Sequence, residues 1–353
     1  NFINYLIQII VGRYLSPEEY GIHNAVLSLG VILTSGTMML MSLGAKYAAP
    51  MRYDQVAAKN LMLRWSKIIV IWSGLGMGML LIFSDAIASF LQLDSNNVVI
   101  AFLTGMIFVH IFTFYQGFLN GLGRHVLANL LGVGLSVVRL LTTWGLLISG
   151  MGYALYTVSA RSFAHVLLAL GGGGLLFSLI GKLSNNVAFD TGLLNQKPEY
   201  NFLFPSFLTW TGIAILTNID IVVIKHHFDA TSAGHFTQAA IIARIGFFVT
   251  SALTMVLLPE ISKTESQRPK HLVRTALLIS GVIAGAFSLA CWIAPDFIVR
   301  VFFSSKASEG TYLPMLSFNY VLVAILNLIF IINLGKGNYR TQIVYFLIII
   351  SFS

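Results

Sequence analysis

The sequence contains little charge and almost no cysteine. Only 10% of its 353 residues are Asp, Glu, Lys or Arg, and Cys291 is the single cysteine. One cysteine excludes an internal disulfide and a thiolate metal cluster. The sequence also lacks a Gly-Lys-Ser or Gly-Lys-Thr phosphate-binding loop, His/Asp/Glu clusters at metal spacing, and paired carboxylates in one loop. These absences favour a protein that is not an enzyme, and we expect no metal or other cofactor.

Long apolar runs dominate what is present. Hydrophobic residues make up 57% of the chain, and the mean hydropathy is +0.83. Runs of a length that suits a membrane helix, about 20 residues, occur near residues 1–12, 21–45, 66–83, 98–119, 126–149, 152–180, 202–224, 235–258, 273–294, 312–334 and 341–353. We predict an all-α polytopic membrane protein with about 11 spans here. Because both end runs are short, we expect at least 12 in the intact chain.

The basic residues are distributed unevenly between the two sides of these spans. The net charge is +8, but the cations are scattered through short loops, which disfavours a nucleic-acid partner. Of the 21 Lys and Arg, three fall inside spans, four lie in loops on one side, and the remaining fourteen lie on the other. The positive-inside rule therefore predicts a cytoplasmic amino terminus.

A charged turn is repeated in degenerate form. Residues 12–21 read Gly-Arg-Tyr-Leu-Ser-Pro-Glu-Glu-Tyr-Gly between two apolar runs, and residues 225–234 repeat the layout so that Gly234 aligns with Gly21. We predict two parallel-repeat helical lobes around a central cavity, an amino-terminal lobe at 1–181 and a carboxy-terminal lobe at 202–353. The polar stretch 182–201 would be the cytoplasmic linker.

The first turn resembles a known signature. Its residues, followed by Asn24 and Ala25, resemble the first-loop motif of polysaccharide flippases in the multidrug/oligosaccharidyl-lipid/polysaccharide exporter superfamily; the motif positions are Gly12, Arg13, Leu15, Pro17, Glu18, Glu19 and Gly21. Residues 218–234 and 258–262 resemble the seventh and eighth helices of that family more loosely, because His226 and His227 replace a glycine or an apolar residue.

The resemblance implies a function and a location. A flippase would move an undecaprenyl-pyrophosphate-linked oligosaccharide, such as an O-antigen, capsule or exopolysaccharide unit, from the inner to the outer leaflet of a bacterial plasma membrane by alternating access. H⁺ or Na⁺ are candidate coupling ions. Membrane lipid and other polysaccharide-assembly proteins are candidate partners.

Three arginines lie within spans. Each costs about 2.5 to 3.5 kcal/mol at a helix centre and therefore needs water, a partner or a ligand. Each shares a helix face with small or polar residues: Arg139 with Gly132, Ser136 and Thr143, Arg161 with Thr157 and His165, and Arg244 with Thr237 and Ser251. Guanidinium groups suit phosphate oxygens, so we interpret all three as candidate pyrophosphate contacts. The alternative is that they bridge helices or reach the headgroups.

Two further side chains in spans could gate transport or couple it to an ion. Asp220 is the one carboxylate clearly within a span, and His165 can titrate. Asp220 could instead simply pair with Arg244 or Lys225. His165 could be a packing residue.

Three other functions remain open. A drug or cation exporter of the same superfamily should carry central acids in its first lobe, where the sequence has two arginines. A peptidoglycan-precursor flippase would share the cationic cavity. A membrane glycan polymerase would need a larger external loop than residues 295–311 provide.

Overall fold

The computed structural model describes residues 2–51, 54–181, 200–261, 270–304 and 310–335. Every regular element in these ranges is helical, which confirms the predicted all-α membrane fold. The chain separates into two compact units, one formed by residues 1–11 and 33–198, the other by 12–32 and 199–353. Residues 12–32, within the predicted first lobe, thus group with the second half. The lobe boundaries stay a prediction, and the linker lies mostly outside the described residues.

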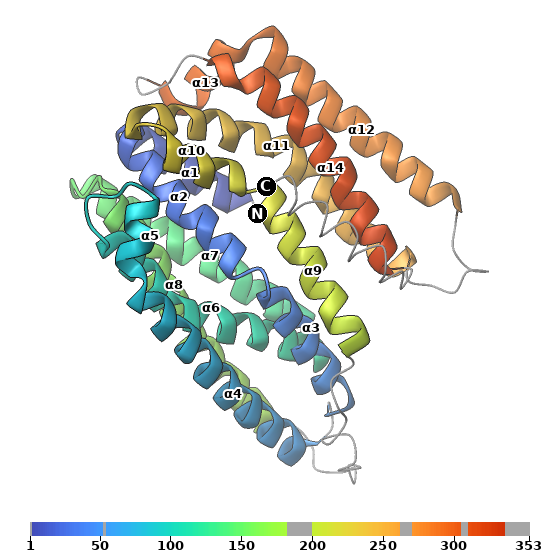
Figure 1. Cartoon of the computed structure of the whole chain (residues 1–353). Coiled ribbons are helices and arrows are strands. Elements are labelled where there is room, and N and C mark those ends of the chain that lie inside the picture. The colour runs from blue at the N-terminus through green and yellow to red at the C-terminus, as the bar shows by residue number, and fades with distance from the viewer. Residues whose placement is uncertain (1, 52–53, 182–199, 262–269, 305–309, 336–353) are drawn as a thin grey trace. The chain divides into compact units, whose positions relative to one another are not determined.

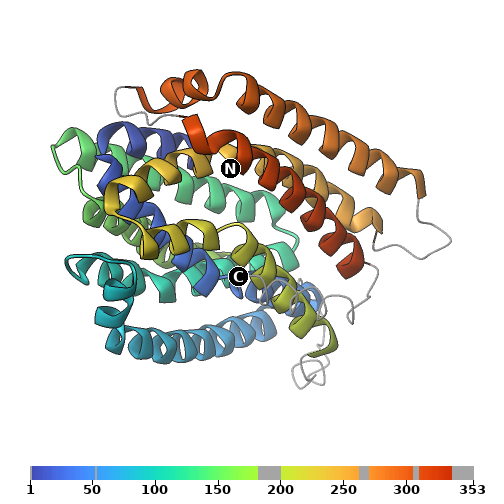
Figure 2. The ribbon, with the colours of Figure 1, turned by 45° about the horizontal axis from the view of Figure 1, so that its top comes forward.

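Unit 1 is built around one helix. Its elements are most of α1 (Phe2–Tyr14), α3 (Thr37–Ala48), η1 (Ala49–Met51), α4 (Gln55–Ile82), α5 (Ser84–Phe90), α6 (Asn97–Gly121), α7 (His125–Ile148) and α8 (Ala154–Ile180). α6 packs against α3, α4, α7 and α8. The contact with α3 is close because Cβ atoms at Gly117 and Gly121 would collide with the α3 backbone. Figure 2 shows α4 along one edge of this unit.

Unit 2 is centred on α11. Its elements are α2 (Pro17–Leu33), α9 (Tyr200–Leu216), α10 (Ile219–His227), α11 (Ala230–Ile261), α12 (Lys270–Ile293), α13 (Pro295–Phe303), η5 (Gly310–Tyr312) and α14 (Leu313–Gly335). α11 contacts α10, α12, α13 and α14, and the long helices α11, α12 and α14 lie side by side (Figure 1).

The helices follow the predicted spans with three breaks. Helices cover ten of the eleven expected runs, and the eleventh, 341–353, lies outside the described residues. Bends of 44°, 46° and 96° separate α2 from α3, α9 from α10, and α12 from α13. By length and composition, the described residues contain five helices able to cross a membrane, or up to eight if each bent pair counts as one span. The 13-residue α1 is too short to be counted.

Local chemistry explains where two of the helices begin. Pro295 opens α13 at a position where its missing N–H is not needed. The Asp229 carboxylate caps α11 by accepting hydrogen bonds from the backbone N–H groups of Thr231 and Ser232. Hydrogen bonds from the side chain and backbone of Ser232 lower the pKa of Asp229. The cap is therefore fully present at neutral pH, because it is lost only as the pH falls below the ordinary aspartate range.

Candidate functional site

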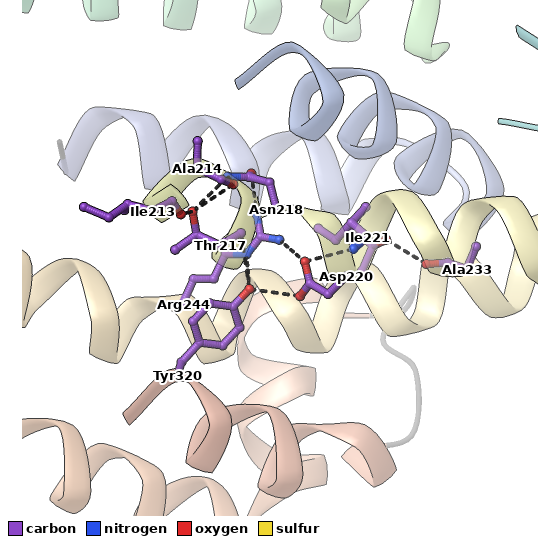
Figure 3. A network of polar contacts seen from close by, with 10 residues as sticks. Ile213, Ala214, Thr217, Asn218, Asp220, Ile221, Ala233, Arg244 and Tyr320 are labelled. Carbon is purple, nitrogen blue, oxygen red and sulfur yellow. Dashed lines mark hydrogen bonds and ion pairs between the residues drawn. The ribbon is translucent and has the colours of Figure 1, made fainter. Parts of the chain in front are cut away.

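In unit 2, Arg244 lies on α11, and its side chain reaches the break where α9 ends and α10 begins. Its Nε donates to the Tyr320 hydroxyl at 2.7 Å, and Nη1 donates to Asn218 Oδ1 at 3.3 Å. Its Nη2 forms an ion pair with Asp220 Oδ1 at 2.8 Å (Figure 3). Arg244 and Tyr320 are only 5% and 1% exposed. The charge of Arg244 is thus balanced inside the protein.

Tyr320 and the helix break complete this network. The Tyr320 hydroxyl lies 2.9 Å from Asp220 Oδ2 and 3.3 Å from the Thr217 carbonyl oxygen. Its single proton can go to one acceptor at a time, and the carboxylate is the shorter contact. Asn218 donates to the Ala214 carbonyl and to Thr217 Oγ1, at 2.9 and 3.0 Å. These side chains satisfy backbone groups that the break between α9 and α10 leaves without helical partners.

The network contains the ion pair between Asp220 and Arg244. The sequence analysis gave this pairing as an alternative to a gating role for Asp220. Sequence reasoning identified Arg244 and Asp220 but not Tyr320, because a tyrosine in an apolar run carries no local signal of its partner. A substrate contact by Arg244 and a gating or coupling role for Asp220 stay predictions. The network itself can hold α10, α11 and α14 in a fixed arrangement.

Unit 1 brings together Arg139, Arg161 and His165. Arg139 is on α7 and the other two are on α8, which packs against α7. The charges of the two arginines act on each other and on His165. Arg139 Nη1 donates to Asn4 Oδ1 at 3.2 Å. Within residues 2–51 and 54–181, neither arginine forms an ion pair, so both positive charges stay unbalanced there.

His165 is held by its own helix. Its Nδ1 lies 2.8 Å from the Arg161 carbonyl oxygen, and its ring packs edge-on against Phe112 at a centroid distance of 6.4 Å. A carbonyl accepts only, so Nδ1 carries the proton. The histidine is buried. It thus has the environment of a packed histidine beside two cations, and its coupling role stays a prediction.

The flippase-like motif lies at the joint between α1 and α2. Arg13 donates from Nε and Nη2 to the carbonyl oxygens of Phe302 and Val301, at 2.8 and 2.6 Å, and so caps the end of α13. Tyr20 packs edge-on against Phe303, with centroids 5.4 Å apart. A Cβ at Gly12 would collide with the same Phe303 ring. These motif residues thus fasten the turn to α13.

The remaining motif positions shape the turn and its contact with α11. Ser16 Oγ accepts a hydrogen bond from the Glu19 backbone N–H at 3.2 Å, with Pro17 at the first helical position. Leu15 is fully buried and Glu18 is exposed. A Cβ at Gly21 would lie 3.0 Å from the Gly234 backbone nitrogen, and one at Gly234 would collide with the Pro17 carbonyl. The motif is therefore a packing device in this structure.

Comparison with known proteins gives a family and a fold. Residues 1–265 match the model of a family described as polysaccharide biosynthesis protein. An uncharacterised membrane protein of Methanocaldococcus jannaschii is 26% identical over 109 residues, which is 31% of this chain but only 26% of that protein.

The similar solved structures are MATE transporters. An inward-facing conformation of a multidrug resistance MATE family transporter of the MOP superfamily matches with a TM-score of 0.70 at 17% identity, covering 96% of this chain and 82% of that one. An outward-facing conformation matches at 0.56 and 17%, covering 97% and 83%. A MATE structure in complex with MaD3S matches at 0.60 and 18%, covering 97% and 80%. At these identities the similarity is one of fold.

Proposed function

Because the chain belongs to the polysaccharide biosynthesis protein family, we propose that it is a secondary transporter that flips an undecaprenyl-pyrophosphate-linked oligosaccharide from the inner to the outer leaflet. The family match and the MATE-like fold support a MOP-superfamily transporter. The lipid-linked cargo, alternating access and the bacterial plasma membrane belong to the proposal.

The observation that carries the proposal is the unbalanced charge in unit 1. Two half-buried guanidinium groups, on α7 and α8, have no carboxylate partner among the described residues of this unit. Such groups favour an anionic ligand, and guanidinium forks suit pyrophosphate oxygens. Arg139 and Arg161 therefore become the leading substrate contacts. In unit 2, Arg244 is available to a substrate only if its ion pair with Asp220 opens, and we assign that opening to the gating step.

The test uses the full-length protein in cells. The gene is deleted, and leaflet-selective labelling then locates the undecaprenyl-linked oligosaccharide. We expect it to accumulate on the cytoplasmic side and to be flipped again by the wild-type gene. The variant R139Q/R161Q should flip at least about 100 times more slowly, because charged hydrogen bonds contribute about 1.5 to 3 kcal/mol each and the variant removes two such groups.

The matched control is R124Q, which removes an exposed arginine at the start of α7. It should restore transport at equal membrane expression. Full rescue by R139Q/R161Q would refute the site but leave the transporter. Unpolymerised glycan already on the outer leaflet of the deletion strain would instead identify a polymerase.

A peptidoglycan-precursor flippase is the second candidate, because its lipid pyrophosphate fits the same cation pair. Deletion would then cause lysis and retain peptidoglycan precursor in the inner leaflet. A cation or drug exporter is less well supported, since both charges of the unit 1 cluster are positive. It would predict drug sensitivity on deletion with no change in lipid-linked glycan.

A further inference from the structure

α4 carries exposed cations at one end of a long outward face. Lys59, Arg64 and Lys67 are all exposed. At 100° per residue they fall within one arc of the helix. Farther along the helix, Leu75 and Met79 are 61% and 63% exposed. The side of α4 that carries Arg64 and Lys67 therefore changes from cationic to apolar along its length, whereas Lys59 lies farther round the helix, beside Phe177 of α8.

Among the described residues of unit 1, the three cations have no acidic partner. α4 contains no Asp or Glu, and Asp54, which precedes it, accepts a hydrogen bond from the Ala57 N–H as the helix cap. Within residues 2–51 and 54–181, none of the three forms an ion pair or a side-chain hydrogen bond. The Lys59 ammonium lies 4.9 Å from the centroid of the Phe177 ring, on the last turn of α8.

The depth of these residues fits one leaflet of a bilayer. Lys67 and Met79 are twelve residues apart, or about 18 Å along a helix, and half of a hydrocarbon core is about 15 Å thick. Beside the cations, Trp65 stacks on Tyr47 with centroids 6.0 Å apart, and Trp and Tyr are enriched at the headgroup level of membranes. The cations therefore lie where phosphate groups are found.

The opposite end of α4 has the opposite charge. The exposed carboxylates of Asp85 and Asp94 follow it, and no Lys or Arg lies between residues 68 and 123. Only the first end of α4 can attract an anionic headgroup.

We propose that Lys59, Arg64 and Lys67 form a binding site for the phosphate headgroup of an anionic glycerophospholipid. The acyl chains lie along the exposed apolar residues of α4, Ile71, Leu75 and Met79. The Arg64 fork and the two ammonium groups supply several donors to one phosphate. Neighbouring cations attract the lipid's net negative charge, which a zwitterionic lipid lacks. This site is separate from the arginines of α7 and α8.

The test measures lipid binding to the purified full-length protein. Delipidated protein in detergent is titrated with phosphatidylglycerol or phosphatidylcholine, and bound lipid is counted by native mass spectrometry. The wild type should prefer phosphatidylglycerol. The variant K59Q/R64Q/K67Q should bind it about 100-fold more weakly, from a factor of about five per cation.

Matched variants separate a site from net charge. R124Q/R274Q/R300Q removes three exposed arginines elsewhere and should leave phosphatidylglycerol binding unchanged. K59R/R64K/K67R keeps the charge and should retain affinity within a few fold. Equal losses in both neutralised variants, or equal wild-type binding of the two lipids, would overturn the proposal. So would displacement of phosphatidylglycerol by inorganic pyrophosphate alone. Binding is read without transport, so failure here leaves the flippase proposal intact.

Discussion

At the scale of single residues, the buried pair of Arg244 and Asp220 makes a quantitative prediction. Replacing one partner leaves the other charge buried and uncompensated, which costs about 3 to 5 kcal/mol. R244Q and D220N should therefore each lower the free energy of unfolding by about 3 to 5 kcal/mol. The double variant R244Q/D220N should lose clearly less than the sum. Denaturant unfolding of the purified protein in detergent measures this coupling.

Tyr320→Phe tests the third member of the network. It removes the hydroxyl that accepts from Arg244 and can donate to Asp220, and we expect a loss of about 1 to 3 kcal/mol. If the losses for R244Q and D220N simply add in the double variant, the ion pair itself contributes nothing to the free energy of unfolding.

Charges within spans were visible in the sequence, but their partners were not. Arg139, Arg161, Arg244 and Asp220 stand out because ionised side chains are rare in apolar runs. The contact with Tyr320 joins residues 76 positions apart and depends on how α11 packs against α14. No spacing rule predicts such a meeting.

At the scale of helices, the approach of α2 to α11 is limited by glycine. A Cβ at Gly234 would meet the Pro17 carbonyl oxygen, a backbone atom that cannot rotate away. G234A should therefore destabilise the protein by about 1 to 3 kcal/mol. Thermal unfolding of the purified variant checks this.

The matched substitution is G281A, in the middle of α12. A Cβ there meets nothing within 4 Å, and alanine is the better helix former by about 1 kcal/mol. It should be neutral or slightly stabilising. If G234A unfolds at the same temperature as G281A, the close approach of α2 and α11 does not constrain the fold.

The sequence predicted where helices occur better than where they break. Runs 21–45 and 202–224 were expected to be single spans, but the structure bends them at residues 34–36 and 217–218. Hydropathy averages over the bend and does not show it. The side chains of Thr217 and Asn218 donate hydrogen bonds to carbonyl oxygens of the preceding helix, α9. Residues 295–311 were expected to form a loop, yet nine of them form α13.

At the scale of the whole molecule, the predicted topology can be tested with one cysteine at a time. Cys291 is fully buried, and its replacement by Ala gives a background without thiols. Ser95→Cys and Asn60→Cys then place an exposed thiol beyond each end of the apolar part of α4. A membrane-impermeant maleimide should label residue 95 in intact cells and residue 60 only after permeabilisation.

The reverse labelling pattern would invert the topology, and labelling of both sites in intact cells would refute α4 as a span. The positive-inside rule could predict this orientation because loop charges are local. It could not predict that residues 12–32 group with the second half of the chain, since that depends on contacts such as the one between Arg13 and α13.

The contact between Gly21 and Gly234 also bears on how such a chain could have arisen. In the predicted repeat, these glycines hold the same position in the two copies of the turn. Equivalent residues meet where a two-fold axis passes, as in an isologous dimer. A half-length ancestor pairing with its own copy would have met itself at this one residue. After gene duplication, both copies would have inherited the same limit on side-chain size, although selection in the ancestor acted on a single glycine.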